Sequence, residues 1–209
     1  MSRLGARILW LATLLALLVP VTPPAAAEPV IVALGDSITA GFGVLPDEAY
    51  PALLAERLRR EGYAYRVVNA GVSGDTTAAA LRRVDWVLRS HPSIVIVALG
   101  ANDGLRHQSV TAMRDNLIAI VRRLRAAGAT VLLTGMHVPP NYGPDYARAF
   151  AAVFPDVARI TNVPLAPFLL DGVAGDPRLN QPDGIHPTAE GQRTITDKLW
   201  PHVKPLLLR

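Results

Sequence analysis

Four short apolar runs, in which hydrophobic residues do not alternate with polar ones, stand out along the chain. They cover residues 30–34, 65–68, 94–99 and 130–133, and Pro164 interrupts a weaker fifth run at residues 163–166. Runs of this length that are rich in Val and Ile are typical of strands covered on both faces, as in a parallel sheet. The pattern therefore predicts five buried strands that run parallel to one another.

Segments with a helical spacing of apolar residues separate these runs. They predict helices over residues 48–61, 76–88, 110–127 and 188–200, and a further helix over residues 142–160 that Pro144 and Pro155 interrupt. In the 110–127 segment, for example, Met113, Leu117 and Ile120 fall on one stripe. Strict alternation of strand and helix indicates an α/β protein. We expect a three-layer α/β/α sandwich of the flavodoxin-like kind, with a five-stranded parallel sheet.

The first 27 residues have the layout of a secretory signal peptide. Arg3 and Arg7 precede an apolar run at residues 8–19, and three alanines at residues 25–27 provide a small-residue cleavage site. The run is shorter than the roughly 20 apolar residues that span a bilayer, and an uncleaved anchor is the alternative. We expect a signal peptide at 1–27 and a single domain at 28–209, secreted across the inner membrane to the periplasm or the extracellular medium, with no stable membrane anchor after cleavage.

The composition excludes several classes of function. The 209 residues include no Cys, which excludes disulfide scaffolds, thiol catalysis and iron–sulfur clusters. The net charge of +4 comes from dispersed residues, without the run of Lys and Arg that nucleic-acid arms carry. A hydrophobic fraction of 50% is enough for a buried core. We expect a globular monomer that binds no nucleic acid.

Small and polar residues follow three of the predicted strands and precede the last predicted helix. The segments are 35–39, 69–76, 100–103 and 183–187, which read GDSIT, NAGVSGDT, GAND and DGIHP. In open α/β sheets, ligands bind beyond the carboxyl ends of the strands. We therefore expect these four segments to meet at one crevice.

The first and last of these segments together contain the groups that acyl transfer requires. Asp183 and His186 are three residues apart in a turn bounded by Gly and Pro, so the carboxylate can orient one imidazole nitrogen. The other nitrogen is then free to accept the proton of the Ser37 hydroxyl, as in nucleophilic catalysis. Taken singly, Ser37 is better interpreted as a helix N-cap, and the Asp-x-x-His spacing as a capped turn before a helix.

The two middle segments offer hydrogen-bond donors for the negative charge that develops on an attacked carbonyl oxygen. Gly74 has no side chain, so a carbonyl oxygen could approach its N–H group, and Asn102 offers an amide NH₂ group. Together with the N–H group of Ser37, they would form three donors of an oxyanion hole. A turn glycine and a loop asparagine that bonds its own backbone are the structural alternatives.

In this order, the four segments resemble the four blocks of the SGNH, or GDSL, hydrolase superfamily. The stretches NAGVSGDTT, LGANDGLR, PPNYG and DGIHP are similar to its secreted bacterial branch of arylesterases and acyl-CoA thioesterase/lysophospholipases. The resemblance implies that Ser37 is the nucleophile, His186 the general base and Asp183 its orienting carboxylate. It also implies the oxyanion hole of Ser37, Gly74 and Asn102, and chemistry without a metal or a cofactor. No Gly-x-Ser-x-Gly surrounds Ser37, which disfavours an ordinary α/β-hydrolase.

The resemblance implies hydrolysis of carboxylic esters and thioesters through an acyl-enzyme, with aryl esters, acyl-CoA or lysophospholipids as substrates. It implies a structural Asp36 that bonds neighbouring loop amides. We expect the substrate to be bound in a cleft formed by Asp36, Asp75, Arg106, His137, Pro140 and Tyr142. Two alternatives stay open: an O-acetylesterase that acts on carbohydrates or glycans with the same three residues, and a secreted binding module without catalysis.

Overall fold

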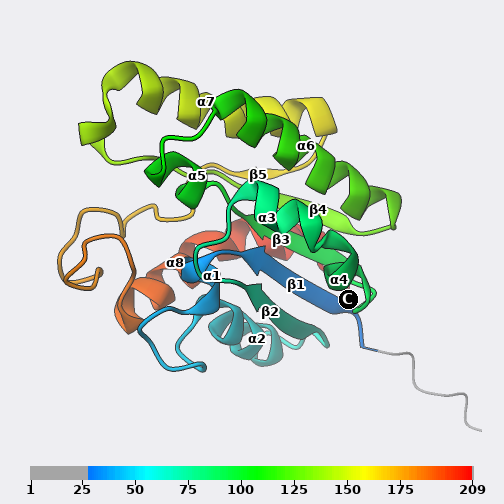
Figure 1. Cartoon of the computed structure of the whole chain (residues 1–209). Helices are drawn as coiled ribbons and strands as arrows, with labels where there is room; N and C mark the ends of the chain where they lie inside the picture. The colour runs from blue at the N-terminus through cyan, green and yellow to red at the C-terminus, as the bar shows by residue number, and fades with distance from the viewer. Residues whose placement is uncertain (1–27, 209) are drawn as a thin grey trace, which may run out of the picture.

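The computed structural model describes residues 28–208, and five parallel strands in this range form one sheet (Figure 1). The strands are β1 (Val30–Gly35), β2 (Arg66–Gly71), β3 (Ile94–Ala98), β4 (Thr130–Thr134) and β5 (Leu165–Ala166). Their order in the sheet is β2-β1-β3-β4-β5, which is the order of flavodoxin-like proteins. The predicted five-stranded parallel sheet is therefore confirmed. β5 is short, since Pro164 before it has no N–H group to donate to a neighbouring strand.

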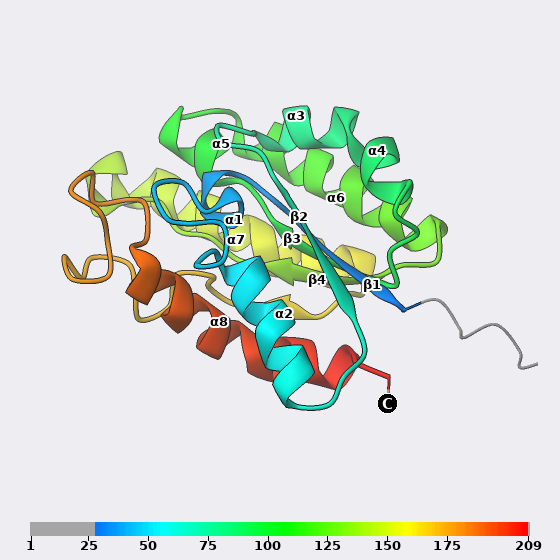
Figure 2. The ribbon, with the colours of Figure 1, turned by 90° about the horizontal axis from the view of Figure 1, so that it is seen from below.

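Helices cover both faces of the sheet and complete the predicted three-layer sandwich. Figure 1 shows α6 (Val110–Ala126) and α7 (Pro144–Thr161) above the sheet, with α3 (Thr77–Arg82), α4 (Val84–Leu88) and α5 (Ala101–Leu105) in the same layer. The opposite layer contains α1 (Ser37–Ala40), α2 (Tyr50–Arg60) and α8 (Ala189–Val203). Seen from below in Figure 2, α2 and α8 lie side by side. Two short 3-10 helices, η1 (Pro140–Tyr142) and η2 (Lys204–Leu206), complete the elements.

Three details of the helices differ from the prediction. The expected helix over residues 76–88 is two helices, α3 and α4, which are separated by Arg83 with φ −106° and ψ 10°. The helix predicted to be interrupted by two prolines is continuous. Pro144 stands at the first turn of α7, where the N–H group needs no partner within the helix. The helix continues through Pro155 because its buried face, which includes Phe154, packs into the core. The short helices α1 and α5 have no helical repeat in the sequence that could have predicted them.

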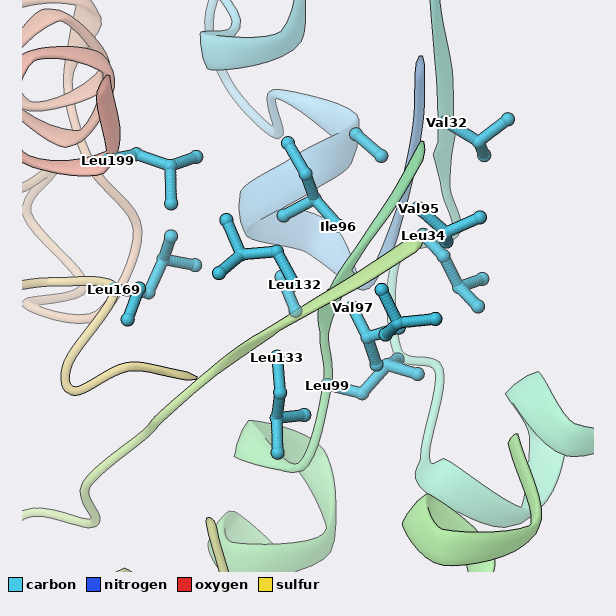
Figure 3. Packing of buried hydrophobic residues seen from close by; sticks show 14 of the residues in the cluster. Val32, Leu34, Val95, Ile96, Val97, Leu99, Leu132, Leu133, Leu169 and Leu199 are labelled. Atoms are coloured by element: carbon cyan, nitrogen blue, oxygen red, sulfur yellow. The ribbon is translucent and has the colours of Figure 1, made fainter. Parts of the chain in front are cut away.

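The core lies between the sheet and the two helical layers. Ile96 of β3 is in register with Leu132 of β4, and Figure 3 shows both side chains pointing toward Leu199 of α8. The next pair in register, Val97 and Leu133, points to the other face, as the two-residue period of a strand requires. All of these residues are buried, so the central strands have no solvated face. This arrangement explains why their sequences do not alternate between apolar and polar residues.

The loops at the carboxyl ends of the strands come together at one end of the sheet. In both Figure 1 and Figure 2, the blue loop after α1 and the orange segment before α8 lie side by side at this end. Among residues 28–208, no helix is long and apolar enough to cross a membrane. The predicted signal peptide at residues 1–27 lies outside the described residues.

Candidate active site

Ser37 stands at the first turn after β1, which lies between β2 and β3 in the sheet. The chain changes from strand to helix within one residue, Asp36, whose Oδ1 accepts a hydrogen bond of 3.1 Å from the Ile38 N–H group. Gly35 is needed at this point, because a Cβ atom there would lie 2.8 Å from the carbonyl oxygen of Ala98. The tight turn places the Ser37 hydroxyl at the carboxyl end of the sheet.

A continuous hydrogen-bond chain joins Asp183, His186 and Ser37. The Asp183 Oδ2 atom lies 2.6 Å from Nδ1 of His186, and Nε2 of the same ring lies 2.9 Å from the Ser37 Oγ atom. Asp183 Oδ1 accepts two further hydrogen bonds of 3.0 Å from the N–H groups of Ile185 and His186. The hydrogen bond from the His186 ring, followed by those from the backbone, lowers the pKa of Asp183 to about 2. The carboxylate is therefore ionised at neutral pH and can orient the ring.

The loop that carries His186 is fixed to the loop that follows Ser37. Gln181 Nε2 donates hydrogen bonds to the carbonyl oxygens of Phe42, at 2.7 Å, and Pro187, at 3.0 Å. The Gln181 N–H group also donates to the carbonyl oxygen of His186 at 2.7 Å. The rings of Phe42 and His186 are in contact, with centroids 4.6 Å apart. These contacts hold the imidazole beside the hydroxyl.

Gly74 and Asn102 reach the same place from two other strand ends. Gly74 lies in the turn between β2 and α3 with φ +83°, a backbone conformation that favours glycine. Asn102 lies in the first turn of α5, directly after β3. Within residues 28–208, the N–H groups of Ser37 and Gly74 make no hydrogen bond to the backbone. Ser37, Gly74 and Asn102 all line one cavity.

This cavity has a volume of about 700 Å³, which is in the range of small-molecule sites. Its wall is largely apolar. The apolar lining includes Ile38, Phe42, Leu105, Met136, Val138, Phe168, Leu170 and Ile185. A hydrocarbon chain attached to a carbonyl at Ser37 would find partners along this wall.

Of the six residues predicted to form the cleft, His137 lines this cavity, and its ring stacks on Phe168 with centroids 4.2 Å apart. Asp36, Tyr142, Asp75 and Arg106 do not line it. Asp36 is buried beneath the turn, and burial raises its pKa to about 6. Tyr142 donates its hydroxyl proton to the carbonyl oxygen of Leu105, at 3.0 Å. Pro140 begins η1, and its side chain lies outside what the structure describes.

Asp75 and Arg106 also fall outside the cavity wall, because each is engaged by another group. Asp75 forms an ion pair of 2.6 Å with Arg83 and is not among the residues that line the cavity. Arg106 is exposed and donates a hydrogen bond of 3.1 Å to the carbonyl oxygen of Gly74. Arg106 therefore contacts the turn that contains Gly74, and Asp75 links the same turn to Arg83.

Sequence reasoning missed most of the apolar wall. Phe168 and Leu170 belong to the irregular segment between β5 and α8, which has no period that could place its side chains. Phe42 follows the first predicted segment closely, and Ile185 lies inside the last one. A large apolar residue so close in sequence to a candidate catalytic residue is a signal that could have found them. Among residues 28–208, no group of three or more His, Cys, Asp or Glu is placed to hold a metal ion.

Comparison with known proteins agrees with this geometry. The model of the GDSL-like Lipase/Acylhydrolase family matches residues 33–194. The chain is 45% identical to "Esterase TesA" of Pseudomonas aeruginosa over 91% of this chain and 94% of that protein. It is 39% identical to "Thioesterase 1/protease 1/lysophospholipase L1" of Escherichia coli over 91% of this chain and 90% of that protein. The crystal structure of TesA superimposes with a TM-score of 0.83 at 44% identity, covering 85% of this chain and 99% of the other. The chain belongs to the GDSL-like Lipase/Acylhydrolase family and is a serine ester hydrolase.

Proposed function

We propose that the protein hydrolyses carboxylic esters and thioesters of apolar acids through an acyl-enzyme on Ser37. The observation that carries the proposal is the hydrogen-bond chain from Asp183 through His186 to the Ser37 hydroxyl, with links of 2.6 and 2.9 Å. Such a chain supplies a nucleophile, a general base and a group that orients the base.

In the first half of the reaction, Ser37 Oγ attacks the acyl carbonyl while Nε2 of His186 takes the hydroxyl proton. The ionised Asp183 stabilises the imidazolium that forms. The carbonyl oxygen becomes an oxyanion, which the N–H groups of Ser37 and Gly74 and the side chain of Asn102 stabilise. His186 then returns the proton to the leaving alcohol, phenol or thiol. In the second half, water attacks the acyl-enzyme by the same sequence and releases the acid.

The apolar cavity supports acyl chains of several carbons as the bound group. A chain of eight carbons would bury its methylene groups against side chains such as Met136 and Leu170, at about 0.8 kcal/mol for each buried CH₂ group. The names of the two relatives, esterase and thioesterase/lysophospholipase, are consistent with an acyl chain as the bound group. We propose aryl esters, acyl-CoA and lysophospholipids as the substrate classes. A glycan acetylesterase is not favoured, because a polar sugar would find few hydrogen-bond partners on this wall.

Replacement of the nucleophile tests the mechanism. Ser37→Ala is expected to fold, since it removes one hydroxyl at the edge of a cavity, and to lose hydrolysis of p-nitrophenyl octanoate. The wild-type protein is expected to bind one fluorophosphonate per chain, and peptide mass spectrometry is expected to find the label on Ser37. Ser93→Ala is a matched control on the opposite end of the sheet, at the start of β3, and should keep full activity. Comparable activity in Ser37→Ala would contradict the mechanism.

Narrowing of the cavity tests the substrate class separately. The wild-type ratio of kcat/KM for octanoyl and acetyl p-nitrophenyl esters is expected to be well above one. Val138→Trp adds bulk inside the cavity, so the octanoyl value should fall at least tenfold while the acetyl value stays within threefold. Val163→Trp, at an equally half-buried valine outside the cavity, is the control. A wild-type preference for the acetyl ester would contradict a lipid-type substrate.

We also propose export and a monomeric state. The N-terminal layout at residues 1–27 supports removal of a signal peptide, after which the domain at 28–209 would be in the periplasm or the medium. Intact mass of the protein recovered from each compartment gives the first residue of the mature chain. Light scattering on the purified mature protein measures its mass in solution. A mass that retains the leader, or a dimer, would contradict the respective proposal.

A further inference from the structure

The proposed oxyanion hole is assembled from separate strand ends, so its dimensions depend on what links those ends. We call residues 35–37 the Ser37 turn and residues 72–76 the Gly74 turn. The strand pairing of β1 with β2 reaches as far as Gly35 and Gly71, and the Val72 N–H group donates to the carbonyl oxygen of Gly35 at 3.0 Å. The strand pairing ends at this bond, so the position of the Gly74 N–H group depends on contacts made by the Gly74 turn itself.

Arg83 connects the two turns. Its Nε atom donates a hydrogen bond of 2.6 Å to Oδ2 of Asp75, next to Gly74. Its Nη2 atom donates a hydrogen bond of 3.0 Å to the carbonyl oxygen of Gly35, two residues before Ser37. The side chains of Arg83 and Asp75 are 18% and 11% exposed, so water competes little for these bonds. One planar guanidinium group therefore contacts both turns at once.

The local chain is shaped to present this side chain. Arg83 interrupts the helix between α3 and α4, with backbone angles outside the helical region. The Nη1 atom of Arg83 is buried and has no hydrogen-bond partner among residues 28–208. A buried donor without a partner costs about 1–3 kcal/mol, so stability alone would not select this arrangement.

We propose that Arg83 is a positioning residue that fixes the Gly74 turn relative to the Ser37 turn. The inference rests on the proposed function, because it concerns the separation between two of the proposed oxyanion donors. The far side of the Gly74 turn is anchored independently, since Asp103 accepts hydrogen bonds of 2.8 and 2.6 Å from Thr77. Loss of Arg83 therefore releases one side of the turn without detaching it from the fold.

Arg83→Lys is the first test. Lysine keeps the positive charge, but its single ammonium group lacks the fork that reaches two acceptors. Misplacement of a donor by about 1 Å costs on the order of 100-fold in rate. The kcat value for p-nitrophenyl octanoate is therefore expected to fall about 10- to 100-fold, while KM stays within threefold. Arg57→Lys is the matched control, because Arg57 forms an ion pair of 2.6 Å with Asp197 and its side chain is 22% exposed, on α2.

A transition-state analogue separates positioning from general distortion. Octylboronic acid forms a tetrahedral adduct with a serine hydroxyl, and one of its oxygens occupies the oxyanion position. The inhibition constant of this compound is expected to rise by the same factor by which kcat falls. The KM value, which reflects binding of the acyl chain to the apolar wall, is expected to stay within threefold. Asp75→Asn, which keeps an acceptor for Nε but removes the charge, is expected to show the same pattern with a smaller amplitude.

The outcomes are distinct. A wild-type kcat value in Arg83→Lys would overturn the proposal. So would a rise in KM by the same factor by which kcat falls and the inhibition constant of the boronate rises. Failure of both Arg83→Lys and Asp75→Asn to fold would also overturn it, because the pair would then be needed for stability rather than for the oxyanion hole. If instead Ser37→Ala kept the activity of the wild-type protein, the proposed function itself would fail, whatever the result at Arg83.

Discussion

Asp36 adjoins the nucleophile and is among the least solvated charges of the protein, which makes it a sensitive test of the structure. Its Oδ1 atom accepts a hydrogen bond from Ile38, but Oδ2 is buried without a partner among residues 28–208. Burial raises the pKa of Asp36 from the ordinary value of 3.8 to about 6, and the Ile38 hydrogen bond and the nearby His186 oppose this rise only in part. We consider the substitution Asp36→Asn, which retains the oxygen that caps Ile38.

The sign and size of the effect follow from proton linkage. Between pH 4 and 6, the folded wild-type protein holds a proton on Asp36 that the unfolded chain has lost, so this carboxyl group lowers stability as pH rises. A difference of about 2 between the two pKa values corresponds to roughly 3 kcal/mol. The amide side chain of the variant does not titrate. The free energy of unfolding of Asp36→Asn, relative to that of the wild-type protein, should therefore rise by up to about 3 kcal/mol between pH 4 and pH 7.

Urea unfolding curves at pH 4, 5, 6 and 7, followed by the fluorescence of the buried Trp200, measure this difference directly. Any fixed penalty of the new amide group shifts all four points equally and does not affect the slope. Asp47→Asn, in the exposed loop before α2, is the control, and its curve should run parallel to that of the wild-type protein. If the curve of Asp36→Asn also ran parallel to that of the wild-type protein, the result would contradict the conclusion that burial raises the pKa of Asp36.

Three further predictions concern the site and its support. Asn102→Ala should lower kcat by about 10²–10³ in steady-state assays without changing the melting temperature, because it removes one oxyanion donor. Asp183→Asn should lower kcat by about 10⁴, since a neutral amide does not hold the imidazole in the required tautomer; a loss below tenfold would contradict its role. Gly71→Ala should lower the free energy of unfolding in urea by about 1–3 kcal/mol, because the new Cβ atom would lie 2.2 Å from the Ala40 nitrogen, and an unchanged midpoint would contradict this crowding.

The parts of the fold that could be predicted from the sequence are those governed by a period or by topology. The central strands are uninterrupted apolar runs because both of their faces are covered, and residues that follow parallel strands must meet at one edge. This reasoning placed Ser37 and His186 at one crevice, and the structure brings their side chains into contact. The helices over 48–61 and 110–127 were predicted to within about two residues of α2 and α6 for the same reason.

The parts that could not be predicted depend on contacts between side chains distant in the chain. Asp75 stands beside the candidate oxyanion donor, and its carboxylate accepts a hydrogen bond from Arg83, eight residues later, a contact that no local pattern in the sequence indicates. Arg83 in turn breaks a helix whose apolar spacing is continuous in the sequence. The wall formed by Phe168 and Leu170 comes from a loop, where side-chain direction is set by tertiary packing rather than by a repeat.

The hydroxyl of Ser37 and the imidazole of His186 come from opposite ends of the described chain, 149 positions apart. Ser37 is therefore synthesised long before its proposed proton acceptor, and α8, which follows His186, contacts the Ser37 helix through the hydrogen bond from Gln192 to the carbonyl oxygen of Ile38. On the proposed mechanism, any truncation before residue 186 lacks the general base and is expected to be inert toward esters. Under that mechanism, ester cleavage reports that the chain has been synthesised past residue 186 and that its two ends have come together.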